Sequence, residues 1–320
     1  MTKQDLKIVF LGTPDFAVES LRAIVDNGFN VVGVVTMPDK PAGRGHKMYE
    51  SPVKLFAKER GLHLMQPVNL KAPEFTEHLR SLDADLFVVI AFRMLPEVVW
   101  TMPRLGTFNL HASLLPRYRG AAPINWAVIN GDTETGVTTF FLKHEIDTGD
   151  IIAQERVAIA PEDNVGDVHD RLMLLGAQLT LRTINDIIAG TLAPIPQDKL
   201  IGDAEPTPAP KIFKETCRID WSKETSAIHN LVRGLSPYPA AWSTLFDGEN
   251  EIGAVKIFQT EVTDRKRAAA PGSVLIEEGH LYVGTAGTDI EILSLQVPGK
   301  RRMPTGDFLR GSRLAAPRFE

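Results

Sequence analysis

Short, mostly apolar runs recur through the N-terminal part of the chain, and they constrain its fold more than any other feature. They occupy residues 7–12, 31–36, 85–91 and 107–111, and segments with helix-start and helix-stop signals separate them. An apolar run of this length without polar alternation is typical of a strand buried on both faces of a parallel sheet. Strands that alternate with helices in this way predict an open, doubly wound α/β sheet.

The composition is that of an ordinary globular protein. The chain has 320 residues, of which 43% are hydrophobic and 23% charged, and this length suits two domains of roughly 150 residues each. No stretch approaches the roughly 20 apolar residues that cross a bilayer, and the N-terminus shows no signal-like apolar segment. We therefore expect a cytoplasmic protein without a membrane partner. Separately, we expect a monomer.

Several classes of protein are disfavoured by what the sequence lacks. A single cysteine, Cys217, excludes an intramolecular disulfide and a cysteine-cluster metal site, and the eight histidines show no paired metal spacing. The turn over residues 12–16 has neither the Gly-x-Gly-x-x-Gly of dinucleotide-binding proteins nor the phosphate-binding loop of ATPases. We expect no metal, and the sequence argues against a nicotinamide oxidoreductase and against an ATPase.

Charge is distributed unevenly along the chain. The net charge of −5 argues against indiscriminate nucleic-acid binding, which usually comes with a basic domain. Basic residues nevertheless gather in residues 40–47, at Arg117 and Arg119, and in residues 300–302, all in loops rich in glycine or proline. A charge cluster in a loop is most often solvated surface, so none of these alone predicts a phosphate contact.

The pattern of apolar residues, prolines and turn signals changes after residue 190. Residues 165–189 have the periodicity of a long amphipathic helix, and the proline-rich residues 191–210 that follow predict an extended linker. Beyond the linker, short strand-like runs are separated by turn signals such as Asp247-Gly248, which favours a small β-barrel of the oligonucleotide-binding type. We predict a first domain over residues 1–190, a linker over 191–210 and a barrel domain over 211–320.

Three polar residues stand where ligands bind in such a sheet. Asn109 and His111 are two apart at the end of a strand, so they share one face at its carboxyl end. Asp147 opens the tight connection Asp147-Thr148-Gly149-Asp150 between two strand-like runs. Each residue alone is more often a turn or capping residue. Together, an amide, an imidazole and a carboxylate can polarise a carbonyl and move a proton.

The run Asn109-Leu110-His111-Ala112-Ser113-Leu114-Leu115-Pro116, followed by the Asp147 motif, closely resembles the 10-formyltetrahydrofolate-dependent formyltransferases. The resemblance implies that Asn109 and protonated His111 stabilise the oxyanion while Asp147 takes up a proton. It also implies 10-formyltetrahydrofolate as the formyl donor. The folate contacts that it implies are Ser113, Leu114, Leu115, Pro116, Phe92, Met94 and Leu95.

Members of the family that formylate methionyl-tRNA resemble nearly the whole chain. They carry a C-terminal barrel of this size and a loop similar to residues 38–45, in which Arg44 matches an arginine that enters the acceptor stem of initiator tRNA. The resemblance implies initiator methionyl-tRNA as acceptor, for translation initiation. The tRNA contacts that we expect are Lys40, Arg44, Lys47, Arg117, Arg119, Lys300, Arg301 and Arg302.

Other readings remain open at this point. An amino-sugar formyltransferase shares Asn109, His111 and Asp147 and can carry a barrel-like second domain, but it would not need the loop over residues 38–45. A glycinamide ribonucleotide enzyme would end near residue 200. A nucleic-acid-binding module with a degenerate first domain is disfavoured by the intact polar set.

Overall fold

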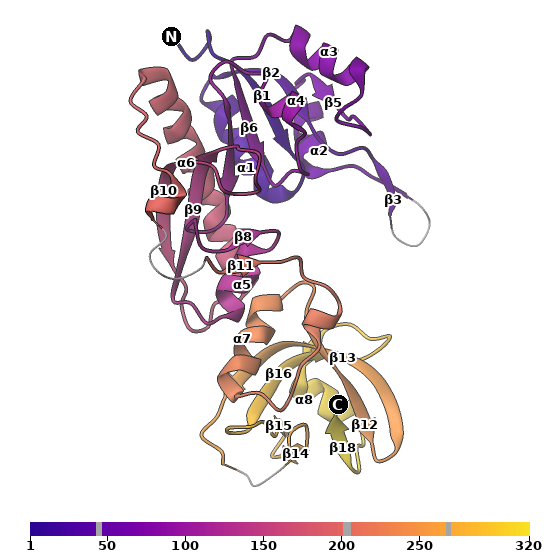
Figure 1. Cartoon of the computed structure of the whole chain (residues 1–320). Coiled ribbons are helices and arrows are strands. Elements are labelled where there is room, and N and C mark those ends of the chain that lie inside the picture. Colours follow the sequence, from indigo (N-terminus) through magenta and orange to yellow (C-terminus); the bar gives the residue numbers. More distant parts are fainter. Residues whose placement is uncertain (43–46, 201–205, 267–269) are drawn as a thin grey trace. The chain divides into compact units, whose positions relative to one another are not determined.

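The computed structural model describes residues 1–42, 47–200, 206–266 and 270–320 (Figure 1). The described residues divide into two compact units, and each unit takes segments from several parts of the chain. Unit 1 comprises Met1–Gly120, Gly136–Val157 and His169–Pro208. Unit 2 comprises Ala121–Thr135, Ala158–Val168 and Ala209–Glu320.

Unit 1 is built on the predicted open sheet, with strand order β10-β9-β7-β6-β1-β2-β5. The strands are β1 (Lys7–Gly12), β2 (Asn30–Val35), β5 (Leu64–Met65), β6 (Leu86–Ile90), β7 (Thr107–His111), β9 (Glu134–Phe141) and β10 (Ile151–Ala158). The pairs β1–β2, β1–β6, β2–β5 and β6–β7 are parallel, whereas β9 runs antiparallel to β7. The doubly wound α/β fold is therefore confirmed.

Helices cover both faces of this sheet. They are α1 (Asp15–Asp26), α2 (Pro52–Glu59), α3 (Pro73–Ser81), α4 (Glu97–Trp100) and α6 (Val165–Ala189). On one face, Val9 and Leu11 pack with Leu79 of α3 and Val99 of α4. On the other face α6 lies so close to β7 that a Cβ on Gly176 would stand 2.7 Å from Leu110. Fully burying an aliphatic side chain contributes roughly 1.5–3 kcal/mol, so these two layers stabilise the sheet that contains β7.

Short elements complete unit 1. β3 (Lys40–Ala42) and β4 (Lys47–Tyr49) pair antiparallel, so Lys40 lies opposite Tyr49. β8 (Arg119–Gly120) and the 3-10 helix η1 (Gln197–Lys199) lie in segments without a clear sequence pattern, as does β11 (Pro208–Ala209), which spans the boundary between the two units. Within the described part of the chain, no helix is both long and apolar enough to cross a membrane.

Unit 2 contains the predicted antiparallel barrel, with strand order β14-β15-β16-β13-β12-β18 and β17 paired to β16. Its strands are β12 (Ala241–Asp247), β13 (Asn250–Val262), β14 (Val274–Glu277), β15 (His280–Val283), β16 (Ile290–Gln296), β17 (Met303–Pro304) and β18 (Pro317–Phe319). A bridge between Ser273 and Arg318 brings the two ends of the sheet together, so the barrel nearly closes.

Helices fill and cap this barrel. They are α5 (Pro123–Ile129), α7 (Thr225–Leu235), α8 (Thr305–Gly311) and the 3-10 helix η2 (Glu215–Cys217). The barrel core contains Trp221, whose indole N–H donates to Oγ of Ser243 at 2.9 Å. Gly234 of α7 lies against Ile129 of α5, where a Cβ would stand 2.5 Å from Cγ1 of that isoleucine. Helix α5, from the middle of the chain, therefore packs as part of unit 2.

Candidate active site

Asn109 is held at the carboxyl end of β7. It lies opposite Val89 of β6 and Phe140 of β9, so the two neighbouring strands fix its backbone. The side chain is half-buried, and among the described residues its amide makes no hydrogen bond. A fixed amide without a protein partner is a donor ready for a ligand oxygen.

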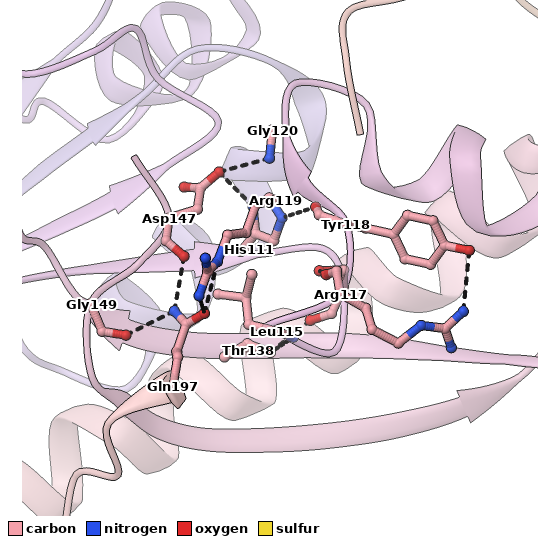
Figure 2. A network of polar contacts seen from close by, with 11 residues as sticks. His111, Leu115, Arg117, Tyr118, Arg119, Gly120, Thr138, Asp147, Gly149 and Gln197 are labelled. Carbon is pink, nitrogen blue, oxygen red and sulfur yellow. Dashed lines mark hydrogen bonds and ion pairs between the residues drawn. The ribbon is translucent and has the colours of Figure 1, made fainter. Parts of the chain in front are cut away.

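His111 ends the same strand and lies between two acceptors (Figure 2). Its side chain is only 9% exposed, and Nε2 lies 2.8 Å from the carbonyl oxygen of Tyr118. Because a carbonyl can only accept, Nε2 carries the hydrogen and donates it. Nδ1 lies 4.0 Å from Oδ2 of Asp147. A doubly protonated ring would therefore have an acceptor beside each nitrogen.

Asp147 stands on a strained turn. Its φ of 56° lies in the left-handed region, which few residues other than glycine adopt. Two residues later, a Cβ on Gly149 would stand 1.5 Å from the carbonyl oxygen of Phe141, so only glycine fits there. The carboxylate accepts the backbone N–H of Gly120 at 3.0 Å. The structure thus brings His111 and Asp147 together, and a non-glycine residue in such strain is often a sign of function.

Gln197 is a part of this network that the sequence did not reveal. Its side-chain N–H groups donate to the carbonyl oxygens of Asp147 and Gly149, each at 2.8 Å. Its Oε1 accepts from Nε and Nη2 of Arg119 at 3.1 and 2.7 Å (Figure 2). The proline-rich sequence around Gln197 predicts an extended linker and gives no sign of this contact. Arg119, predicted as a tRNA contact, is engaged by Gln197 in the structure.

The loop over Ser113–Pro116 is tied down by side chains. Ser113 donates Oγ–H to the carbonyl oxygen of Arg117 at 2.7 Å, and Thr138 donates to the carbonyl oxygen of Ser113 at 2.6 Å. Gln154 donates to the carbonyl oxygen of Leu115 at 2.8 Å. The side chain of Leu115 is buried against Phe140, whereas Leu114 is half-buried and Pro116 half-exposed. The backbone of this loop is therefore fixed by hydrogen bonds from side chains.

The other predicted folate residues do not gather into one wall. Leu95 is buried in the sheet core beside Val99, and Phe92 packs against the same core while staying half-buried. Met94 is 72% exposed. Between them, the Arg93 guanidinium donates to the carbonyl oxygens of Val68 and Pro67. Partial burial lowers the pKa of that guanidinium.

The predicted tRNA contacts belong to both units. Arg44 lies outside the described residues, Lys47 lies in β4, and Lys40 is exposed in β3. Arg117 is exposed, with its guanidinium 5.0 Å from the ring centre of Tyr118. Lys300 and Arg301 are exposed in unit 2.

Arg302 borders a small polar cavity of about 140 Å³ in unit 2. Its guanidinium stacks 4.6 Å from the ring centre of Phe258, and Nε donates to Oγ of Ser294 at 3.0 Å. Arg233 and His229 line the same cavity. Burial, and then the nearby Arg233 charge, lower the pKa of His229.

Family models match both halves of the chain. The model described as formyl transferase matches residues 6–184, and the model of the formyl transferase C-terminal domain matches residues 211–313.

Curated relatives match almost the full length. A methionyl-tRNA formyltransferase of Bacteroides fragilis is 58% identical over 316 residues, covering 98% of this chain and 97% of that protein. A methionyl-tRNA formyltransferase of Porphyromonas gingivalis is 48% identical over 321 residues, covering 100% of this chain and 99% of that protein.

Solved structures share the fold at low identity. The N-formyltransferase from Helicobacter canadensis, in complex with folinic acid and dTDP-3-aminofucose, has a TM-score of 0.67 and 21% identity, and covers 90% of this chain and 98% of that one. HypX from Aquifex aeolicus, in complex with tetrahydrofolic acid, has a TM-score of 0.61 and 19% identity, and covers 94% of this chain and 46% of that one.

Proposed function

The chain belongs to the formyl transferase family, and from that premise we propose that it formylates the α-amino group of methionine on initiator methionyl-tRNA. The formyl donor in this proposal is 10-formyltetrahydrofolate. The observation that carries the choice of acceptor is the 58% identity, over 98% of the chain, to a protein named for that reaction. The product, N-formylmethionyl-tRNA, would serve translation initiation.

Asn109 is the proposed donor to the formyl oxygen. When bound, the folate supplies the formyl group on N10. Attack by the amine forms the new C–N bond and leaves negative charge on the formyl oxygen, until the bond from the formyl carbon to N10 breaks and tetrahydrofolate leaves with a proton on N10. The Asn109 amide has no hydrogen-bond partner among the described residues, so it can take this charge without breaking another contact. Losing one such donor typically costs about 2.7–4 kcal/mol of barrier.

His111 and Asp147 are proposed to act as one unit. Their 4.0 Å separation places the carboxylate beside Nδ1 of the imidazole, and a positive charge on that ring would stabilise the developing oxyanion. Because Tyr118 already accepts from Nε2, we assign His111 mainly to this electrostatic role. The carboxylate of Asp147 would take up the proton that the attacking amine loses, directly or through water.

The folate is proposed to bind beside the loop over Ser113–Pro116. Side-chain hydrogen bonds fix the backbone of this loop, so its remaining polar groups would meet the pterin without reorganisation. Leu114 and Pro116 are the members of the predicted set that combine this position with a partly exposed side chain. Leu95 and Leu115 would support the site from the core.

The tRNA is proposed to meet exposed cations of both units. Lys40 and Arg117 of unit 1, and Lys300 and Arg301 of unit 2, are exposed and can neutralise phosphates. Arg44 and Lys47 complete the predicted set, and Arg302 would reach a phosphate at the rim of its cavity. For Arg119, the contact with Gln197 favours a supporting role. We propose that the protein works as a cytoplasmic monomer without a metal.

The decisive experiment compares two acceptors. The purified protein is given 10-formyltetrahydrofolate with either charged initiator methionyl-tRNA or a dTDP-linked amino sugar, and N-formylated product is measured. We expect product only with the charged tRNA, and loss of that product in Asn109→Ala. Formylation of the sugar but not of methionyl-tRNA would replace the proposal with the amino-sugar function. If tetrahydrofolate is released with neither the charged tRNA nor the amino sugar, both the proposed function and the amino-sugar function are contradicted.

A further inference from the structure

We propose that Gln197 is a positioning residue for formyl transfer, which together with Arg119 fixes the turn that carries Asp147. This inference rests on the proposed function for its kinetic test, and on the hydrogen-bond network alone for its structural test. Gln197 is 2% exposed in unit 1, far along the chain from Asp147 and from Arg119.

The amide of Gln197 uses its entire hydrogen-bonding capacity. A primary amide offers two N–H donors and two acceptor lone pairs. Both donors are taken by the carbonyl oxygens of Asp147 and Gly149, and both lone pairs face the N–H groups of Arg119. Exchanging the oxygen and nitrogen would oppose oxygen to carbonyls and NH₂ to the guanidinium. The partners therefore allow a single orientation of this side chain.

The Asp147 turn needs an outside support. Asp147 holds a left-handed φ of 56°, and the residues just before it, Lys143–Ile146, are exposed. Backbone strain of this kind costs of the order of 1–3 kcal/mol and persists only where the surroundings over-determine it. The two bonds from Gln197 to Asp147 and Gly149 supply such a constraint from inside the fold.

The hydrogen-bonded pair of Gln197 and Arg119, here called the clamp, is also connected to His111. Tyr118 accepts the hydrogen of Nε2 of His111, and Gly120 donates to the Asp147 carboxylate. The residue between them, Arg119, donates two hydrogen bonds to Oε1 of Gln197 (Figure 2). Three consecutive residues thus contact His111, Gln197 and Asp147. Gln197 thereby sets the spacing of the imidazole and the carboxylate.

The test is Gln197→Glu, because a carboxylate keeps the contact with Arg119 but cannot donate to the two carbonyls. A misplacement of about 1 Å in a catalytic group can cost about 10²-fold in rate. We expect the single-turnover rate at saturating substrates to fall by roughly 10- to 100-fold, with both KM values within about twofold of the parent. A rise in KM at an unchanged rate would overturn the proposal.

A double-mutant cycle shows whether Gln197 acts through Asp147. In an Asp147→Asn background, Gln197→Glu should lower the residual rate by no more than about twofold, because the group that it positions is already disabled. If Gln197→Glu lowers the single-turnover rate as much in the Asp147→Asn background as in the parent, Gln197 acts elsewhere and the proposal is overturned.

Thr183→Val is the matched control for loss of stability. Its hydroxyl is buried and pairs with Thr139 at 2.8 Å inside unit 1, apart from the network around Asp147. It should lower the melting temperature while leaving the transfer rate within about twofold of the parent. A loss of rate matching that of Gln197→Glu would assign both effects to stability and overturn the proposal.

Hydrogen exchange separates the clamp from the proposed function. Gln197→Glu should speed amide exchange over residues 147–150, and Thr183→Val should not. Unchanged exchange there would overturn the clamp even in an active enzyme. If the parent formylates neither acceptor while the exchange difference is present, the proposed function fails and the clamp stands.

Discussion

The backbone N–H of Gly120 donates to Oδ2 of Asp147 at 3.0 Å, although 27 residues separate them in the chain. The same oxygen lies 4.0 Å from Nδ1 of His111. A carboxylate held by a backbone amide keeps its direction whatever the imidazole does. Asp147 therefore faces His111 from one fixed position, and in the proposed mechanism it meets the incoming amine from that same position.

Asp147→Asn should leave the fold intact and suppress formyl transfer strongly. The asparagine oxygen can still accept from Gly120, but a neutral amide cannot take up the proton that the attacking amine loses. We expect a loss of roughly 10²- to 10⁴-fold in the single-turnover rate, with an unchanged melting temperature. A rate within about threefold of the parent would remove Asp147 from the mechanism.

Asn109→Ala should separate activity from stability. Because the amide has no hydrogen-bond partner among the described residues, its removal should change the unfolding free energy by less than about 0.5 kcal/mol. The chemical step should slow by roughly 10²- to 10³-fold, as for other oxyanion donors. His111→Ala should combine with it non-additively, since both are proposed to serve one oxyanion. Fully additive losses in the double variant would argue against a shared site.

Gly149→Ala should destabilise unit 1. The new Cβ would meet the carbonyl oxygen of Phe141 at 1.5 Å, so the backbone of the Asp147 turn must move. We expect a loss of about 3 kcal/mol or more in a urea titration. Gly28→Ala is the control for backbone conformation alone, because the φ of Gly28 is positive, at 74°, but no atom lies within 4 Å of the new Cβ. Gly28→Ala should lower the unfolding free energy by only about 1–2 kcal/mol.

His229 should make the protein less stable in mild acid. Burial, and then the Arg233 charge, lower its pKa in the folded state. Below the unfolded value of about 6.5, the unfolded chain therefore binds a proton that the native state resists, and stability falls until the folded pKa is passed. His229→Gln should lose less unfolding free energy between pH 7.5 and 5.5 than the parent. Parallel pH profiles for parent and variant would contradict this reading.

Lys300 and Arg301 should contribute to tRNA affinity through counterion release. Each phosphate contact contributes about 0.7–0.9 to the slope of log affinity against log salt concentration. The double variant Lys300→Ala/Arg301→Ala should therefore flatten the slope by about 1.4–1.8 and leave folate affinity unchanged. Lys223→Ala, an exposed lysine of the same unit, is the control. An unchanged slope in the double variant would take these two residues out of the tRNA surface.

The sequence was sufficient for the sheet and for the barrel because burial leaves a strong pattern there. The apolar run Lys7–Gly12 is a central strand with neighbours on both sides, and its pattern follows from that position. The two-residue strand β5 and the short β17 and β18 carry no comparable pattern, since so few residues cannot show a period.

The candidate site was predictable only in part. Asn109 and His111 share a strand, so their period of two places them on one face, and Asp147 follows from its turn. Gln197 was not predictable, because its bonds join backbone carbonyls and an arginine that are remote in sequence. Arg119 illustrates the same limit, because the sequence around a basic loop residue does not distinguish an arginine that binds phosphate from one that binds a buried amide.

Unit 2 takes Ala121–Thr135 from the middle of the chain, and this fixes an order of events during synthesis. Asn125 of α5 donates to the carbonyl oxygen of Gly234 in α7, a residue made more than a hundred positions later. While the ribosome is still adding those residues, α5 has been translated but its packing partner has not. The face of α5 that packs against α7 therefore stays exposed on the nascent chain until α7 has been synthesised. Exposed apolar surface at this stage favours aggregation.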